Sequence, residues 1–399
     1  MQIYDTGTSS QREPEPGGNE AGHSALVHDH IAAEVRRAGG WISFDRYMDL
    51  ALYAPGLGYY SAGAHKLGAG GDFATAPEIS RLFGACVARQ CAEILAAVDE
   101  GSILEIGAGS GCLAGDVLQG LERAGFLPRR YSILEVSADL RARQQDHLGR
   151  CVPHLASRIA WIDSPPAARF DGVILANEVL DALPVTRFRW SAGALAELGV
   201  GLERGRFVPV PRPASPAMAA QCERLRAAAG ADWPDGYESE YCPRIAPWTL
   251  AVTSALGAGA VLWFDYGLPR AQYYLPERAS GTLLCHYRQR VIEDPFLRPG
   301  LQDITAWVDF TALAEAGEEA GFGIAGYTNQ AYFLAGTRVD AEMRSLAGQD
   351  QNRYARLANE ARRLMMPGEM GERFKAMAWA RDLGPPLAGF GLRDLRHTL

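Results

Sequence analysis

One stretch of the chain restricts its possible folds more than any other. Residues 102–106 are apolar except for Ser102 and Glu105, as in a parallel strand that is buried on both faces. Gly107, Gly109 and Gly111 follow at every second position, which permits a sharp turn and lets a ligand lie against the backbone without Cβ clashes. The next residues place apolar side chains at helical spacing. A strand, a glycine turn and a helix in this order predict an α/β fold with a ligand at the turn.

Two acidic residues indicate which ligand the turn holds. Gly109-x-Gly111-x-x-Ala114 fits the dinucleotide pattern only loosely, so the glycines leave both NAD and S-adenosylmethionine (SAM) open. Glu105 lies two residues before the first glycine, where it would repel a pyrophosphate but suits the ammonium and sulfonium of SAM. Glu135 ends the next predicted strand, where a carboxylate can accept hydrogen bonds from the ribose of either ligand. The sequence favours SAM, with an NAD-linked oxidoreductase as the weaker alternative.

The composition excludes several classes of protein. The chain has 399 residues, of which 48% are hydrophobic and 22% charged, as in ordinary globular proteins. Its net charge of −8 argues against nucleic-acid binding as the main function. No apolar run approaches 18 residues, so neither a membrane span nor a secretory signal is predicted. The seven cysteines and eight histidines lack metal-ligand spacing, which predicts reduced thiols, a cytoplasmic location and no metal.

Four regions can be predicted along the chain. Residues 1–25 are rich in Gly, Ser, Pro and Glu and are expected to be a disordered tail. Residues 26–100 are expected to form a helical cap with a glycine-rich loop. Residues 101–340 alternate between strand and helix patterns and form the predicted core, which an insertion at 185–250 interrupts. Residues 341–399 are expected to be a helical extension.

The predicted core strands indicate a Rossmann-like sheet. Five strands are expected to be parallel, and they cover residues 102–106, 131–136, 158–162, 171–176 and 260–264. Residues 323–327 and 331–335 also have strand patterns, and only three residues join them. Because that link is too short for a parallel crossover, the last strand is expected to run antiparallel. Parallel strands followed by a reversed last strand are typical of class I SAM-dependent methyltransferases.

Acidic side chains follow the fourth and fifth strands, where ligands bind in open α/β sheets. The candidate catalytic residues there are Asn177, Glu178, Asp181 and Asp265. Methyl transfer from SAM is a direct displacement, so the enzyme mainly aligns the reacting groups. A guanidinium acceptor, however, needs acids that hold it and take up its proton. These residues therefore predict a cationic acceptor, although Asp181 could instead begin a helix and Asp265 could hold a backbone turn.

Three further acids have two readings each. Asp163 ends the third strand, where it is expected to contact the adenine amine or to be a plain loop residue. Asp72 belongs to the glycine-rich loop, which is of a kind that closes over ligands, so Asp72 could contact the cofactor or cap a helix. Glu78 and Thr75 have capping-box spacing, but Glu78 could equally contact the ligand. The predicted cofactor-binding residues are Glu105, Gly107, Gly109, Ser110, Gly111, Glu135, Asp163 and Asp72.

Five motifs in order give the chain a specific resemblance. They are Gly71-Asp72-Phe73-x-Thr75-x-Pro77-Glu78-Ile79-Ser80, Asn177-Glu178-x-x-Asp181-Ala182-Leu183-Pro184, Asp265-Tyr266-Gly267, Asp303-Ile304-Thr305-x-x-Val308-Asp309-Phe310 and Pro367-Gly368-Glu369-Met370-Gly371-x-x-Phe374-Lys375. Over residues 26–380 the chain resembles the MidA family, whose mitochondrial members are arginine methyltransferases needed for assembling respiratory complex I. The resemblance implies SAM-dependent methylation of a protein arginine to symmetric dimethylarginine, with a complex I subunit as the acceptor in mitochondria.

One departure from the family affects the acceptor. Mitochondrial members tend to have Gly-Pro-Gly-Arg-Gly where this chain has Gly107-Ala108-Gly109-Ser110-Gly111. The chain also lacks a convincing presequence, which indicates a bacterial, cytoplasmic member whose acceptor can differ. A non-enzymatic assembly factor on the same fold and a small-molecule methyltransferase remain alternatives.

Overall fold

The apolar strands of the core meet in one mixed sheet. The computed structural model describes residues 16–62, 75–230, 232–384 and 386–399. The sheet order is β14-β15-β9-β4-β1-β2-β3, and the short strand β13 also pairs with β9. The bounds are β1 Ser102–Ile106, β2 Tyr131–Leu134, β3 Ile159–Ile162, β4 Phe170–Asn177, β9 Leu256–Leu268, β13 Val308–Asp309, β14 Gly323–Asn329 and β15 Phe374–Arg381. All five predicted parallel strands are present in this sheet, so the predicted fold class is confirmed.

The reversed strand comes from a different part of the chain than predicted. Strand β15 runs antiparallel to both β9 and β14. Residues 331–335 were expected to supply it, but they lie in helix α11 (Gln330–Gly336), where the Asn329 side chain accepts from the Tyr332 N–H at 3.0 Å. The alanines and methionine of β15 favour helix, and a short apolar run does not distinguish strand from buried helix. The prediction for 331–335 was therefore wrong.

Helices cover both faces of the sheet. One face packs on α4, α5, α6, α11, α12 and α13, and the other packs on α8 and α10. Their bounds are α4 Arg81–Leu95, α5 Cys112–Ala124, α6 Ala138–Cys151, α8 Ile245–Thr253, α10 Phe310–Glu319, α12 Val339–Ala347 and α13 Gln351–Met365. Short 3₁₀ helices follow at Pro153–Arg158, Ala388–Phe390 and Arg396–Thr398. The strands are apolar on both sides because both faces are buried.

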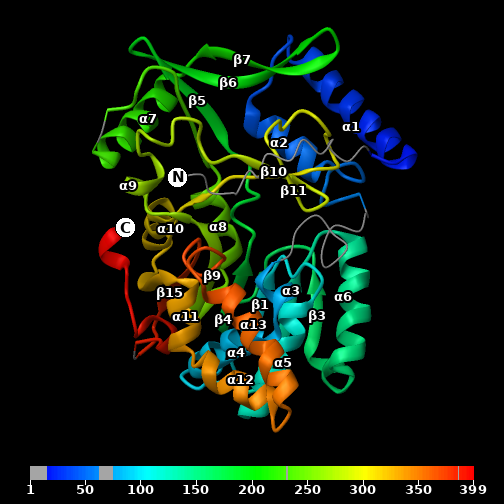
Figure 1. The fold of residues 1–399 in the computed structure, drawn as a ribbon, viewed down its shortest axis with the longest axis vertical. Coiled ribbons are helices and arrows are strands. Elements are labelled where there is room, and N and C mark those ends of the chain that lie inside the picture. Colours follow the sequence, from blue (N-terminus) through cyan, green and yellow to red (C-terminus); the bar gives the residue numbers. More distant parts are fainter. Residues whose placement is uncertain (1–15, 63–74, 231, 385) are drawn as a thin grey trace.

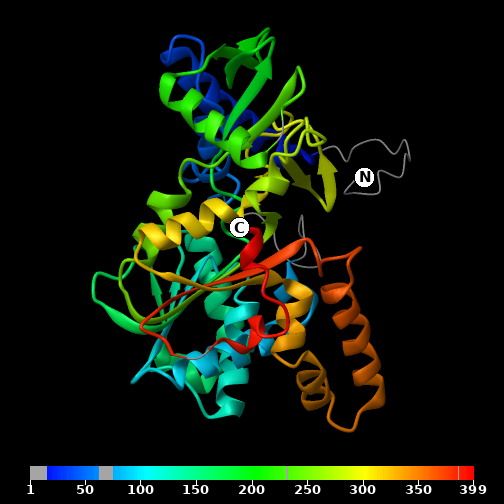
Figure 2. The ribbon, with the colours of Figure 1, turned by 90° about the vertical axis from the view of Figure 1, so that its left-hand side faces the viewer.

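A second lobe lies over one end of the core (Figures 1 and 2). The insertion forms an antiparallel sheet, β7-β6-β5-β8, and a second small sheet, β11-β10-β12, adjoins it. Helices α1 and α2 pack on these strands, and α7 and α9 complete the lobe. The bounds are α1 Gly18–Arg37, α2 Phe44–Tyr53, α7 Pro216–Ala229, α9 Arg270–Tyr273, β5 Thr186–Ser191, β6 Ala194–Glu203, β7 Arg206–Pro213, β8 Tyr237–Tyr241, β10 Leu284–Tyr287, β11 Arg290–Ile292 and β12 Asp303–Thr305.

The boundaries of the two lobes differ from some of the regions predicted along the chain. Helix α1 begins at Gly18, inside the stretch expected to be a tail. Residues 26–100 divide between the lobes, because α1 and α2 pack on the inserted strands whereas α4 packs on the core. The backbone of Ile42, which exchanges hydrogen bonds with Val200, makes this link directly. The predicted extension 341–399 contains core strand β15. No helix within the described ranges is long and apolar enough to cross a membrane.

Candidate active site

The glycine turn after β1 has the backbone geometry that its sequence predicts. Gly107, Gly109 and Gly111 have φ values of +64°, +55° and +84°, a region that other residues rarely adopt. A Cβ on Gly107 would lie 3.1 Å from a methyl group of Val179. The turn therefore requires glycine, and it lies directly against the segment that follows β4.

The two readings of Glu78 are resolved in part by its hydrogen bond. The Thr75 side chain makes no cap, and the helix that follows it, α3 (Ala76–Ile79), is only four residues long. Ser80 caps α4 instead, accepting from the Leu82 N–H at 3.2 Å. Glu78 accepts a hydrogen bond from the Ser110 hydroxyl of the glycine turn. Glu78 therefore lies at the turn, and its predicted contact with a ligand stays a prediction.

Glu105 lies beneath the turn and not on its open side. Its side chain is 2% exposed, and it accepts from the Tyr131 hydroxyl at 2.7 Å. Burial is the main reason that the pKa of Glu105 rises to about 7. The carboxyl group is thus a buried hydrogen-bond acceptor below the turn, and its predicted contact with the cofactor stays a prediction.

Glu135 is held by a network that the sequence did not reveal. Its carboxylate accepts from the Ser137 N–H at 2.8 Å and from the Gln144 side-chain amide at 3.0 Å. The same amide donates to the Gly109 carbonyl, and its oxygen accepts from the Trp161 indole, each at 3.0 Å. Gln144 is fully buried and joins the glycine turn to the ends of β2 and β3. Nothing in the sequence separates Gln144 from the exposed Gln145 beside it.

The remaining predicted cofactor residues are less constrained. Asp163 follows β3 directly and is exposed, with its carboxylate accepting from the Ser164 hydroxyl at 3.3 Å. Asp72 lies outside the described residues. The carboxylates of Glu78, Glu105 and Glu135 lie at or under the turn. This set of acids fits a ligand that carries positive charge and no phosphate.

The end of β4 has an unusual backbone. Glu178 has a φ of +51°, in the left-handed region, and its N–H donates to the Phe264 carbonyl at 2.8 Å. Such strain in a residue other than glycine is concentrated at functional sites. The Asn177 amide donates to the Glu178 carboxyl at 3.3 Å, which helps to orient it.

Asp265 holds this backbone in place. One of its carboxyl oxygens accepts from three successive N–H groups, those of Val179, Leu180 and Asp181, at 3.2, 2.9 and 3.3 Å. The other oxygen accepts from the Tyr266 N–H at 2.9 Å. Of the two predicted readings of Asp265, these bonds fit the holding of a turn, not contact with an acceptor.

A pocket of about 310 Å³ lies between the two lobes, at the carboxyl ends of β4 and β9. Glu178 and Asp181 line it from the core. Several lining residues were missed as single candidates because they come from distant segments: Tyr60, Tyr266, His286, Asp303, Thr305 and Trp307. The sequence signalled Tyr266 through the Asp265-Tyr266-Gly267 motif and Asp303 and Thr305 through the Asp303-Ile304-Thr305 motif.

The pocket concentrates acidic groups among aromatic side chains. The Tyr60 hydroxyl donates to Asp303 at 2.9 Å, and the Tyr266 hydroxyl donates to Asp181. Burial, followed by the charge of Asp181, raises the pKa of Glu178 to about 8. Burial likewise raises the pKa of Asp181 to about 6 and lowers the pKa of His286. Bringing a cation into this pocket would stabilise the ionised carboxylates.

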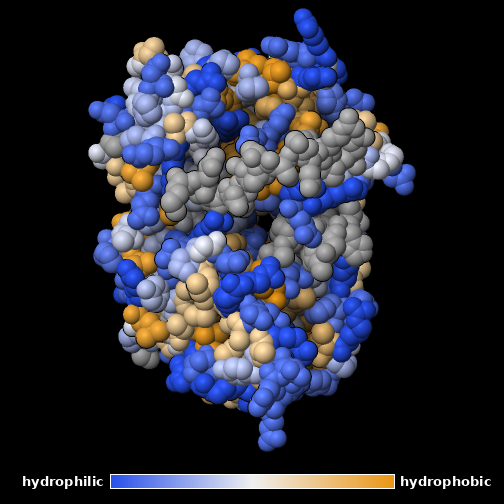
Figure 3. Space-filling model, in the orientation of Figure 1, coloured by the Kyte–Doolittle hydropathy of each residue, from blue (hydrophilic) through white to orange (hydrophobic). Residues whose placement is uncertain are grey.

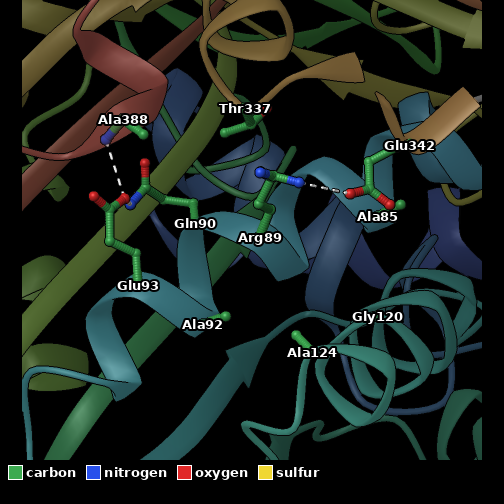
Figure 4. Close-up of a pocket in the computed structure, with 10 residues that line it drawn as sticks. All are labelled: Ala85, Arg89, Gln90, Ala92, Glu93, Gly120, Ala124, Thr337, Glu342 and Ala388. Carbon is green, nitrogen blue, oxygen red and sulfur yellow. Dashed lines mark hydrogen bonds and ion pairs between the residues drawn. The ribbon is translucent and has the colours of Figure 1, made fainter. Parts of the chain in front are cut away.

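A second cavity has no such chemistry. It measures about 440 Å³ and lies between α4, α5 and the segments near Thr337 and Ala388 (Figure 4). Its polar side chains are mutually paired: Arg89 contacts Glu342 at 3.2 Å, and Glu93 accepts from the Ala388 N–H at 3.1 Å. Within the described ranges, no group of three or more His, Cys, Asp or Glu side chains is arranged to hold a metal ion.

Known proteins resemble this chain over most of its length. The model of the Methyltransf_28 family of S-adenosyl-L-methionine-dependent methyltransferases matches residues 86–328. The mitochondrial protein arginine methyltransferase NDUFAF7 of Danio rerio is 30% identical over 382 residues, which are 87% of this chain and 85% of that protein. The human protein of the same name is 28% identical, with 90% of this chain and 85% of that protein covered.

Solved structures of similar proteins also support a methyltransferase fold for this chain. A Burkholderia thailandensis protein crystallised with S-adenosyl-homocysteine is 42% identical, with a TM-score of 0.92, and the match covers 97% of this chain and 100% of that one. A native structure from the same organism has a TM-score of 0.89 at 41% identity, with the same coverage. SAM, predicted from the acids around the glycine turn, is thus the cofactor, and the protein is a methyltransferase. The chain belongs to the MidA family of SAM-dependent methyltransferases.

Proposed function

We propose that this protein methylates an arginine side chain of a protein acceptor. The observation that carries the proposal is the acidic pocket between the lobes. Its lining residues Glu178 and Asp181 flank Val179 in the chain, and Val179 lies against Gly107 of the glycine turn. A guanidinium is planar and cationic, so it pairs well with carboxylates and stacks on aromatic rings. The pocket offers Glu178, Asp181 and the aromatic side chains of Tyr60 and Trp307.

The proposed roles follow from the positions of these groups. Bound SAM supplies an activated methyl group on its sulfonium. Glu178 holds the guanidinium and takes the proton that its nitrogen loses as the new N–C bond forms. Asp181 balances the remaining positive charge, and Asn177 orients Glu178. Asp265 keeps the turn that carries both acids in place, so it is a positioning residue.

The finer points of the activity are proposed from the family. The product would be symmetric dimethylarginine, as the resemblance to the MidA family implies. The relatives are protein arginine methyltransferases by name, which supports a protein acceptor. A cytoplasmic protein, with a respiratory complex I subunit as the first candidate, is the acceptor that we propose.

Glu178→Gln tests the proposed chemistry. We expect kcat for an arginine peptide to fall by roughly 10²- to 10⁴-fold, because a proton acceptor is lost. Binding of S-adenosyl-homocysteine, measured by calorimetry, should stay within about twofold. Glu203→Gln, on the exposed end of β6, is the matched control and should behave as the parent protein does.

Mass spectrometry of the host proteome, with and without the gene, would identify the acceptor by its missing methylarginine. Two results would contradict the proposal. The first is full activity of Glu178→Gln. The second is a host in which methylarginine is unchanged and Glu178→Gln complements the deletion, which would indicate an assembly factor that needs no catalysis.

A further inference from the structure

The acidic pocket has a rim of opposite charge that the proposed chemistry does not use. Helix α13 carries four exposed arginines, which are Arg353, Arg356, Arg362 and Arg363. Arg363 also lines the pocket. Within the part of the chain that the structure describes, none of the four forms a side-chain ion pair, although Arg353 and Arg356 lower the pKa of nearby Asp350. Among the described residues, these four arginines therefore give α13 an exposed positive surface.

Helix geometry places two of these arginines in a line that leads to the pocket. Arg356 and Arg363 are seven residues apart, so they share one side of the helix and lie about 10 Å apart along it. Leu357 and Leu364 are buried on the side that packs on the core. We call Arg356 and Arg363 the basic face of α13. Figure 2 shows α13, in orange, at the edge of the molecule with its outer side open.

The basic face is anchored in a fixed position relative to the pocket. Glu360 of α13 accepts from the Ser80 hydroxyl at 2.6 Å. The Leu364 carbonyl accepts from the buried Gln330 amide at 2.9 Å. The rim is therefore held on the core beside the pocket, as a preformed binding surface requires.

The arrangement of charges around the pocket favours a partner that carries both a cation and nearby anions. The acids of the pocket favour a cation, whereas the arginines of the basic face favour anions. Glu369 and Arg373 line the pocket as well. On the face seen in Figure 3, hydrophobic residues form small scattered groups, so a partner there meets mainly polar side chains. An arginine followed or preceded by acidic residues provides both kinds of charge. An extended chain advances about 3.3–3.6 Å per residue, so acids about two to six residues from the arginine would reach Arg363 and Arg356.

We propose that the basic face of α13 binds an acidic segment of the acceptor protein and thereby selects which arginine enters the pocket. This inference rests on the proposed function for the identity of the methylated group. The binding of the acidic segment itself can be measured without any methyl transfer.

The experiment compares two synthetic peptides. Both have one central arginine in a glycine-serine background, and one has glutamates three and six residues to either side where the other has glutamines. Methyl transfer gives kcat/KM for each peptide. Fluorescence anisotropy of the labelled peptides, with the enzyme saturated by S-adenosyl-homocysteine, gives binding. We expect the acidic peptide to be preferred by roughly threefold to tenfold in both measurements.

Two variants locate the source of this preference. Arg356→Glu should abolish or reverse the preference, because it puts a like charge opposite the acidic segment. Arg224→Glu makes the same charge change on α7 in the other lobe, where its guanidinium contacts only Gln221 among the described residues. That control should keep the preference. High salt should also remove the preference, because it shortens the range of these interactions.

Each outcome decides one of the two proposals. Equal use of both peptides by the parent protein, or an unchanged preference in Arg356→Glu, would overturn the role of the basic face while arginine methylation stands. Arg356-dependent binding of the acidic peptide without methylation would keep the surface and overturn the proposed function. Tighter Arg356-dependent binding of a labelled oligonucleotide than of the acidic peptide would assign the face to nucleic acid and overturn the inference.

Discussion

The glycine turn and the acidic pocket lie close together but are formed in different ways. The turn and its helix occupy residues 102–124, where strand, glycines and helix follow one another directly. The pocket takes Tyr60 from after α2, Glu178 from the end of β4, Asp303 from β12 and Arg363 from α13. The glycine turn depends on the backbone conformation of a few neighbouring residues, whereas the pocket depends on how the two lobes pack together. Changes at each site should therefore have different consequences.

The largest effect expected from this comparison separates cofactor binding from folding. Gly109→Val forces a branched side chain onto a residue with a φ of +55°. We expect affinity for S-adenosyl-homocysteine, measured by calorimetry, to fall by about 100-fold or more, because strain of this kind costs about 1–3 kcal/mol and the turn must also shift. Gly149→Val, on an exposed part of α6 with open space around it, is the control and should bind normally. Unchanged affinity in Gly109→Val would remove the turn from the cofactor site.

A smaller effect distinguishes positioning from catalysis at Asp265. Burial and the neighbouring acids raise the pKa of Asp265, so a neutral Asn resembles it and keeps an acceptor for the three N–H groups. Asp265→Ala removes that acceptor and should lower the free energy of unfolding by about 3 kcal/mol. Urea denaturation and kcat/KM together should show Asp265→Asn much closer to the parent than Asp265→Ala. An equally severe loss of kcat/KM in stable Asp265→Asn would instead indicate a direct catalytic role.

The smallest effect is the pH dependence of stability. The pKa of Glu178 is raised to about 8 and that of Asp181 to about 6, so the folded protein binds these protons more tightly than the unfolded chain does. Their contribution is fully present below pH 4 and is lost as the pH rises to about 8. We expect the free energy of unfolding to fall by roughly 1–3 kcal/mol between pH 5 and 8. The same measurement on Glu178→Gln should give a shallower decline, and an identical slope would contradict the raised pKa.

Much of the core could be predicted because it obeys local rules. The parallel strands are continuous apolar runs, and the helical pattern of α2 ends at Tyr53, two residues before Pro55. Strand β15 could not be predicted in the same way. Its alanines, methionine and tryptophan become a strand only because β9 and β14 leave a gap between them for its backbone to pair with.

Some residues of the candidate site could also be predicted from local sequence, and others could not. Asn177, Glu178 and Asp181 could be proposed because they follow a buried strand directly, and all parallel strands of a sheet end at one edge. That Asp265 accepts hydrogen bonds from three N–H groups could be seen only in the structure, because residue spacing does not predict hydrogen-bond geometry. Gln144 was missed for the same reason.

The sequence by itself determined the glycine turn, the acids around it and hence the cofactor, because these depend on backbone conformation and charge within a few residues. Tertiary structure alone decided that Tyr60 and Asp303 line the pocket and that Arg363 of α13 borders it. Those residues lie up to about 300 positions apart, and only the burial of apolar surface between the lobes brings them together.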